Sequence, residues 1–277
     1  MTMFNLPGNI KPMKELSKIL IVIMVGFLLA GCVASQRSTI SRAKRIKIAL
    51  IKYEMAINII IHKDYRNLAK AFKYLEEAKK TLRNDPRVYY LLAIAYQLRG
   101  NTKEYEFYLK KTISIDKNFF DAYNALGIYY FGLRKYNKAI DMFTKLIKNP
   151  LYPSADVAFY NRALVYMSLG KTKYAMDDLR NAIVFSNYSN PVYYKALINL
   201  EIKNKMYLRA LKDLTNMEDR LGESCFTELK KALCYIKIKE FNQALWELSR
   251  IKQTSGNCYN DKNKLLKEIE NDNNTNN

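Results

Sequence analysis

Residues able to do chemistry are few in this chain, which has one histidine and four cysteines among its 277 residues. The histidine, His62, stands at the end of an expected helix, and we interpret it as a solvent-exposed residue. Nucleophilic or acid–base catalysis requires a nucleophile with a base and an orienting group within reach, and no motif in the sequence supplies such a set. The cysteines, Cys32, Cys225, Cys234 and Cys258, are spaced unlike a zinc site. These residues predict a protein that is not an enzyme and that holds no metal or other cofactor.

The first of the cysteines follows an apolar run. Ile19–Leu29 holds eleven apolar or small residues without a charge, and Lys11, Lys14 and Lys18 precede it. At about 1.5 Å per residue, this run is too short to span a hydrocarbon core of about 30 Å. A basic start, a short apolar run and a small-residue exit predict a secretory signal over residues 1–31.

The signal ends on the letters LAGC, residues 29–32, which resemble the lipobox of bacterial lipoproteins. The resemblance implies cleavage before Cys32, a diacylglycerol on its sulfur and an acyl chain on its amine. Several acyl chains anchor a protein durably to a membrane. Val33 stands where an aspartate would retain enteric lipoproteins at the inner membrane, so we expect an outer-membrane protein that faces the periplasm, with residues 32–41 as its lipidated N-terminus and linker. The alternative is an ordinary signal or an anchor helix in which the cysteine occurs by chance.

The chain is strongly basic, with a formal net charge of +20. Residues 1–31 carry three lysines and one glutamate, so the remainder carries +18. Such a charge attracts polyanions, and for a cytosolic chain nucleic acid would be the first candidate. An exported chain instead meets lipid head groups, cell-wall polymers and acidic protein segments, so we expect no nucleic-acid partner.

A period of 34 to 36 residues runs through the rest of the chain. A small or aromatic residue recurs, each time with a larger apolar residue four positions later on the same helix face. The recurring residues are Ala71, Tyr105, Ala139, Ala175, Ala210 and Ala244. Another helix-like stretch precedes each of them. A period near 34 with two helices per unit is typical of tetratricopeptide repeats, which close their core by stacking.

We therefore predict an all-α fold, a tetratricopeptide-repeat superhelix of about six helix-turn-helix units over residues 42–257. Residues 42–62 should form the first helix of a degenerate opening unit. In the stretch YNALGIYYFGLRKYNKAIDMF, we expect Gly127 to face Ala139, because the two helices approach closely there. Residues 258–277 are expected to be a polar tail, and its end, NDNNTNN, should be disordered because it has no apolar residue.

Two of the remaining cysteines stand at the ends of the last predicted hairpin. Cys225 opens its first helix and Cys258 follows its second, and these ends meet in an antiparallel hairpin. Because the periplasm is oxidising, we predict a disulfide between Cys225 and Cys258. Cys234 should be buried inside the helix as a small apolar residue.

A narrower resemblance lies between Ala139 and Ala175, where the step lengthens to 36 residues. The residues that carry it are Leu151, Tyr152, Pro153, Phe159, Tyr160 and Asn161. With the lipobox, this stretch resembles the type IV pilus biogenesis/stability lipoproteins, the pilotins, over roughly residues 65–215. The resemblance implies a non-enzymatic protein that binds secretin subunits and promotes their assembly in the outer membrane. The chain departs from the pattern at Arg162, where a leucine is expected, and at Glu201, where an aromatic residue is usual.

A repeat of this kind binds an extended segment or a helix along the face built from its first helices, and spacing selects the residues that would line this groove. They are Tyr90, Ile94, Gln97, Asn124, Ile128, Phe131, Tyr160, Leu164 and Met167. The set is apolar and aromatic with a few amides, which suits an amphipathic protein partner. Alternatively, some of these side chains only pack between neighbouring units. Lys195 and Asn199 lie one turn apart but lack the companion residues of a carboxylate clamp.

Two functions fit these features. The first is a lipid-anchored pilotin, which we expect to be monomeric and to bind a secretin subunit. The alternative is a general scaffold lipoprotein of the envelope that serves cell-wall enzymes or outer-membrane protein assembly.

Overall fold

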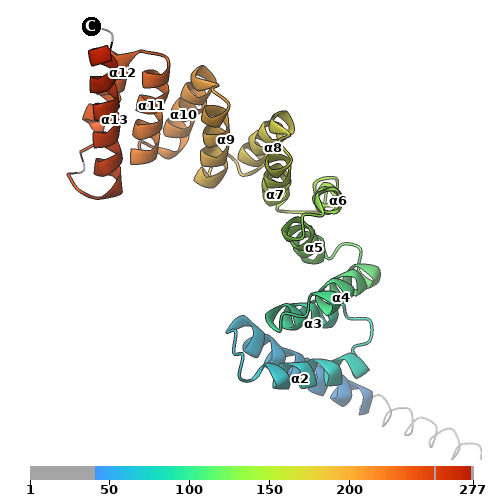
Figure 1. Ribbon diagram of the computed structural model, residues 1–277. Helices are drawn as coiled ribbons and strands as arrows, with labels where there is room; N and C mark the ends of the chain where they lie inside the picture. The colour runs from blue at the N-terminus through green and yellow to red at the C-terminus, as the bar shows by residue number, and fades with distance from the viewer. Residues whose placement is uncertain (1–40, 253, 276–277) are drawn as a thin grey trace, which may run out of the picture. The chain divides into compact units, whose positions relative to one another are not determined.

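The structure is a computed structural model that describes residues 41–252 and 254–275 (Figure 1). The described residues form helices and no strand, which confirms the all-α prediction. Within this part of the chain, no helix is both long and apolar enough to cross a membrane. The predicted signal and Cys32 lie outside the described residues. The chain divides into two compact units, Met1–Asp116 and Lys117–Asn277.

The first unit holds a helix over residues 41–61, followed by α2 (Leu68–Thr81), α3 (Pro86–Leu98) and α4 (Thr102–Ile115). Capping residues determine where these helices begin. The Asp85 carboxylate accepts a hydrogen bond from the Arg87 amide at 3.0 Å at the start of α3. The Asn101 side chain accepts one from the Glu104 amide at 3.3 Å at the start of α4.

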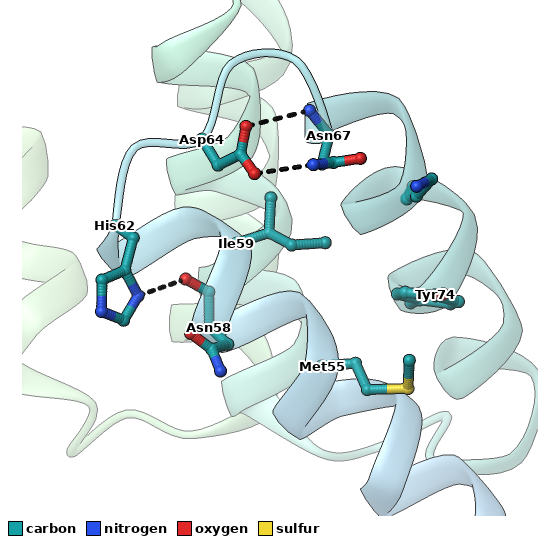
Figure 2. A pocket seen from close by; sticks show the side chains of 8 residues that line it. Met55, Asn58, Ile59, His62, Asp64, Asn67 and Tyr74 are labelled. Atoms are coloured by element: carbon teal, nitrogen blue, oxygen red, sulfur yellow. Dashed lines mark hydrogen bonds between the residues drawn. The ribbon is translucent and has the colours of Figure 1, made fainter.

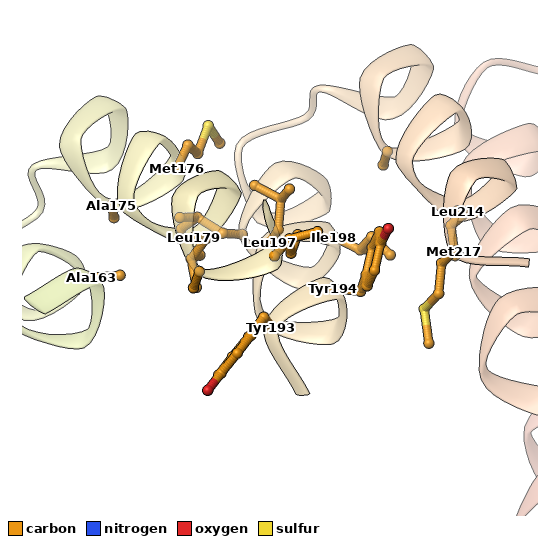
Figure 3. Close-up of a cluster of buried hydrophobic side chains, with 14 of the residues drawn as sticks. Ala163, Ala175, Met176, Leu179, Tyr193, Tyr194, Leu197, Ile198, Leu214 and Met217 are labelled. Carbon is orange, nitrogen blue, oxygen red and sulfur yellow. The ribbon is translucent and has the colours of Figure 1, made fainter. Parts of the chain in front are cut away.

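The second unit consists of four helical hairpins and one further helix. The hairpins are α5 (Phe120–Gly132) with α6 (Tyr136–Ile147), α7 (Ala155–Ser168) with α8 (Thr172–Phe185), α9 (Pro191–Lys203) with α10 (Tyr207–Leu221), and α11 (Cys225–Lys237) with α12 (Phe241–Arg250). The last helix is α13 (Gly256–Thr275). Each hairpin packs on the next, so that apolar side chains from α7 to α11 form one continuous core, part of which Figure 3 shows.

The recurring small residues form the contact between the two helices of each hairpin. Ala71, Ala139, Ala175, Ala210 and Ala244 are fully buried, and Tyr105 is buried as well. Gly127 is also needed for close packing. A Cβ at Gly127 would lie 2.5 Å from the Phe143 ring, so the glycine makes room for that ring, one turn beyond Ala139 on α6.

One turn position repeats with the same period as the core. The second residue after the first helix of a hairpin adopts a left-handed conformation, with φ between 50° and 76°. The residues at this position are Lys63, Gly100, Arg134, Gly170, Lys205 and Lys239. This conformation ends a helix and satisfies its last carbonyl groups, and glycine adopts it at the least cost. The period read from the core therefore extends to the backbone of the turns.

The C-terminal segment differs from the prediction of a polar tail. It forms the helix α13, which packs on α11 and α12 and buries Ile269. The helix continues to Thr275, so the disorder expected for NDNNTNN is wrong that far. A disulfide joins Cys225 at the start of α11 to Cys258 near the start of α13, and Lys237 near the end of α11 pairs with Glu268 at 2.7 Å. These two links show that α13 runs parallel to α11. Cys234 is fully buried, as expected.

Candidate functional site

The nine residues expected to line a binding groove fall into both units. Tyr90, Ile94 and Gln97 lie on α3 in the first unit, where Gln97 is exposed and the other two are half-buried. The other six residues, on α5 and α7 in the second unit, are Asn124, Ile128, Phe131, Tyr160, Leu164 and Met167. Among these six, Ile128 is the most accessible, with 51% of its surface exposed, and the others are half-buried. We describe the α5–α7 face below, because contacts join its two helices.

An amide pair connects α5 to α7. Asn161 Nδ2 donates a hydrogen bond to Asn124 Oδ1 at 3.0 Å, and both side chains are part-buried. In the sequence, Asn161 belongs to the stretch that resembles the type IV pilus lipoproteins, but its spacing does not predict it as a groove residue. Its contact with a predicted groove residue shows that it belongs to the same face.

Aromatic side chains continue this face from α7 to α9. The Tyr160 and Tyr193 rings lie 5.0 Å apart between centroids, and the Tyr193 hydroxyl donates to Asp156 Oδ2 at 3.0 Å. Burial, together with the Asp156 carboxylate, raises the pKa of Tyr193 to about 12, so its hydroxyl remains a donor at neutral pH. Tyr160 and Met167 also pack against the buried core of the second unit. These two therefore contribute to packing between hairpins, which leaves Ile128, Phe131 and Leu164 as the residues more available to a partner.

The groove positions of the last hairpin are covered by α13. Leu229 and Leu233 stand at the repeat positions of Tyr160 and Leu164, and together with Leu265 of α13 they line a cavity of about 290 Å³ between α11 and α13. Leu229 and Leu265 pack against the same apolar cluster. The C-terminal helix thus occupies the face that earlier hairpins present to solvent, and it caps the repeat.

Arg162, the first departure from the repeat pattern, is held inside a buried polar cluster. Its Nε and Nη2 atoms donate to the two carboxylate oxygens of Asp178, each at 2.8 Å, and Nη1 donates to Thr144 Oγ1 at 2.9 Å. Asp178 is 4% exposed. An ion pair between α7 and α8 therefore fills the space where the repeat usually has a leucine.

Glu201, the second departure, is fully buried in α9 and accepts a hydrogen bond from Arg180 Nη2 at 2.6 Å. Asp213 of α10 shares Arg180, with 3.6 Å between the charged atoms. Glu201 Oε2 and Asp213 Oδ2, the latter being the oxygen 3.6 Å from Arg180, are buried without a hydrogen-bond partner in the structure. Burial, followed by the neighbouring Asp213 carboxylate, raises the pKa of Glu201 to about 8. Burial therefore favours the protonated form of Glu201, and this side chain faces the core rather than a binding partner.

A surface pocket of about 500 Å³ lies in the first unit between residues 41–61 and α2 (Figure 2). Its polar groups bond to each other: His62 Nδ1 donates to the Asn58 carbonyl at 2.8 Å, and Asp64 Oδ2 accepts from Asn67 Nδ2 at 2.7 Å. His62 is exposed at the end of its helix, as expected. No group of three or more His, Cys, Asp or Glu side chains among the described residues could hold a metal ion. The polar groups of the pocket are therefore hydrogen-bonded within the turn before α2, and apolar side chains lie beside them.

Comparison with known proteins supports the repeat assignment. A family model, Tetratricopeptide repeat, matches residues 86–119 and 120–149. No curated protein sequence matches the chain.

Solved structures resemble the chain along most of its length. PilF of Pseudomonas aeruginosa is 16% identical with a TM-score of 0.57, and the match covers 78% of this chain and 97% of PilF. PilW, a widely conserved type IV pilus biogenesis factor, is 16% identical with a TM-score of 0.56, over 77% of this chain and 97% of PilW. YrrB, a repeat protein with an unusual peptide-binding site, is 16% identical with a TM-score of 0.53, over 72% and 97% of the two chains. The chain has the helical tetratricopeptide-repeat fold, and its structural neighbours include proteins of type IV pilus biogenesis.

Proposed function

We propose that this protein is a lipid-anchored pilotin that binds secretin subunits and promotes their outer-membrane assembly in type IV pilus biogenesis. The observation that carries the proposal is the match over 97% of both PilF and PilW. At 16% identity this likeness concerns the fold, so the pilus role also depends on the lipobox-like end of the predicted signal. Tetratricopeptide repeats are scaffolds for protein interaction, which fits an adaptor.

The α5–α7 face is the proposed binding surface for the secretin subunit. Ile128, Phe131 and Leu164 supply apolar contacts, and the Asn124–Asn161 amide pair beside them can hydrogen-bond to a backbone. An amphipathic segment would bury its apolar side chains against the first set, where aromatic residues are frequent hot spots. Because α13 covers the last hairpin, we place the partner on the hairpins before α11.

The experiment that tests the pilus role is secretin assembly in a strain that lacks this protein. Assembled secretin rings are separated from monomers by blotting unheated envelope fractions. We expect the multimers to be lost while monomers persist, and to return with the wild-type gene but not with Cys32→Ala. Normal multimers and normal pili in the deletion strain would reject the pilotin function.

A matched pair of substitutions tests the binding face. Ile128 and Val184 are both 51% exposed, but Ile128 lies on the α5–α7 face and Val184 on α8. We expect Ile128→Glu to reduce the secretin multimers and Val184→Glu to leave them unchanged. Equal loss with both variants would show that the α5–α7 face is not the surface used.

The second candidate function is a general envelope scaffold for cell-wall enzymes or outer-membrane protein assembly. It is favoured by the likeness to YrrB, a repeat protein with an unusual peptide-binding site. If the deletion strain has normal multimers, cross-linking from position 128 in cells should capture a different envelope protein, and its identity would define the function.

A further inference from the structure

The helix over residues 41–61 has apolar side chains outside its packed face. Ala49, Ala56 and Ile60 are buried within the unit. Ile48, Ile51 and Met55 are exposed by 44%, 51% and 44% of their surface. Their spacing of three and then four residues places them in one stripe, on a side of the helix different from that of the buried alanines. We call Ile48, Ile51 and Met55 the apolar stripe.

The apolar stripe continues into the pocket of the first unit. Met55 and Ile59 line this pocket, and Figure 2 shows both pointing toward α2, where Tyr74 lies. The side chains of the apolar stripe therefore adjoin the apolar side chains of the pocket and are not isolated on the surface.

Cations surround the apolar stripe. Residues 41–61 contain five basic residues and one acid, Glu54. The basic residues are Arg42, Lys44, Arg45, Lys47 and Lys52. Lys52 pairs with Glu77 of α2, whereas the other four form no ion pair with the described residues. Lys44 precedes Ile48 by four residues and so lies in line with the stripe.

The combination of exposed apolar side chains with cations that form no ion pair within the described part of the chain limits the partners that fit. A second copy of this chain would bring its own net charge of +20, which repels the basic surface. Nucleic acid would pair with the cations but would leave the isoleucines in water. A bilayer surface that contains anionic phospholipids offers phosphates to the cations and an apolar interior to the stripe.

We propose that residues 41–61 lie along the surface of an anionic phospholipid bilayer, with the apolar stripe entering the acyl boundary and Arg42, Lys44, Arg45 and Lys47 among the head groups. The inference rests on the proposed function in one respect, that an anchor on Cys32 would hold the helix near the membrane. Ser41 lies nine residues after Cys32. An extended segment of nine residues spans about 30 Å. The surface itself requires no acyl chain, and this makes it separately testable.

The experiment is vesicle flotation of the chain from residue 32 with Cys32→Ser, which retains every described residue and cannot be acylated. The probes are vesicles of phosphatidylcholine alone and vesicles with phosphatidylglycerol added. We expect flotation with the anionic vesicles only, weakening as salt is raised. Equal binding to both vesicle types, or no binding to either, would overturn the proposal.

Charge-reversal variants locate the surface. Each basic residue near an anionic membrane strengthens binding roughly fivefold, so Lys44→Glu with Lys47→Glu should weaken it by roughly 25-fold or more. The matched control is Lys171→Glu with Lys173→Glu, two exposed lysines in the second unit, and it should bind like the parent chain. Ile51→Ser should also weaken binding, and circular dichroism checks that each variant is folded. Equal loss with the control pair would show a general charge effect and overturn the proposal.

Two further outcomes distinguish membrane binding from a dimer interface and from the pilotin function. If the chain is a dimer by light scattering and Ile51→Ser makes it a monomer, the stripe is an interface between two copies and the membrane proposal fails. Flotation does not involve a secretin. A chain that binds anionic vesicles while secretin assembly is normal in the deletion strain would therefore retain this inference and lose the pilotin function.

Discussion

Two buried charged clusters in the second unit differ in how well their charges are balanced. Around Arg162, one guanidinium meets one carboxylate, and both oxygens of Asp178 accept hydrogen bonds from it. Around Glu201, two carboxylates share Arg180, which is 32% exposed, and each leaves one buried oxygen unbonded. The comparison shows two ways in which a repeat can replace an apolar contact. One is an ion pair in which every carboxylate oxygen is hydrogen-bonded, as in Arg162–Asp178. The other is a pair of neighbouring carboxyl groups, Glu201 and Asp213, that is stable when one of them is protonated.

The largest expected change in the free energy of unfolding comes from breaking the Arg162–Asp178 ion pair. Asp178→Ala should leave the Arg162 guanidinium largely buried without its partner, which destabilises a fold by about 3–5 kcal/mol. Urea unfolding followed by circular dichroism measures the loss. Asp177→Ala, next to it on the exposed side of α8, is the control and should change the free energy of unfolding little. A loss for Asp178→Ala no larger than for this control would mean that the pair does not stabilise the fold.

The Glu201 cluster should make stability depend on pH. The folded chain holds a proton on Glu201 up to a pKa of about 8, whereas the unfolded chain releases it near the ordinary value of 4.5. Stability therefore falls as pH rises from 4.5 to about 8 and levels off above it. Glu201→Gln keeps this position neutral, so it should make the decline shallower and be more stable than wild type near pH 9, by about 1–3 kcal/mol. The remaining decline belongs to Glu228 and Glu247, whose pKa values burial also raises.

Unfolding in urea between about pH 5 and pH 9 measures this dependence. Glu270→Gln in α13 changes an exposed glutamate and serves as the control, which should follow the wild type. A decline in Glu201→Gln as steep as that of the wild type would assign the pH dependence to another group.

A smaller effect is expected when the Arg162–Asp178 ion pair is replaced as a whole. Arg162→Leu restores the residue that the repeat pattern favours, and Asp178→Leu removes the carboxylate at the same time. Because apolar residues often replace a buried ion pair without loss, the double variant should lie within about 1 kcal/mol of wild type or be more stable. Each single variant should be less stable than the double variant in the same urea experiment, and additive losses would contradict a coupled pair.

The smallest effect is expected at the edge of the Glu201 cluster. Arg209 is 55% exposed and lies 3.9 Å from Glu201, so solvent screens the interaction. Arg209→Ala should cost about 0.5 kcal/mol or less, whereas Arg180→Ala removes the hydrogen bond that Glu201 accepts and should cost more. Thermal unfolding of the two variants side by side checks the order, and equal losses would show that exposure does not separate the two arginines.

The repeat and most of its contacts could be predicted from the sequence because they depend on local spacing. Residues such as Ala139 and Phe143 stand four apart on one helix, so periodicity alone places them on the same buried face. The pattern predicts Gly127 as a close-packing residue but not its contact with the Phe143 ring, because facing side chains depend on how two helices are offset. The α5–α7 face was predicted in part, and Asn161 was missed because its contact with Asn124 joins different hairpins.

The helix α13 shows where composition misleads. The last residues are polar, yet Leu265, Leu266 and Ile269 form a short apolar face on a helix that lies against α11. Three apolar residues in a polar segment give a weak signal. The helix is stable only because α11 provides an apolar surface for these residues and because Cys225 of α11 forms a disulfide with Cys258 of α13.

The sequence by itself determined the period, the paired helices of the repeats and the buried small residues, because each follows from spacing along the chain. It also predicted the disulfide between Cys225 and Cys258, but Cys258 lies in α13 and not at an end of the last hairpin. Tertiary structure alone decided the role of the two exceptions. Arg162 and Glu201 find their partners on other helices, and whether a charge is buried, paired or protonated depends on what those helices bring within a few ångströms. Periodicity states that a side chain faces inward, but only the packed structure determines what it meets there.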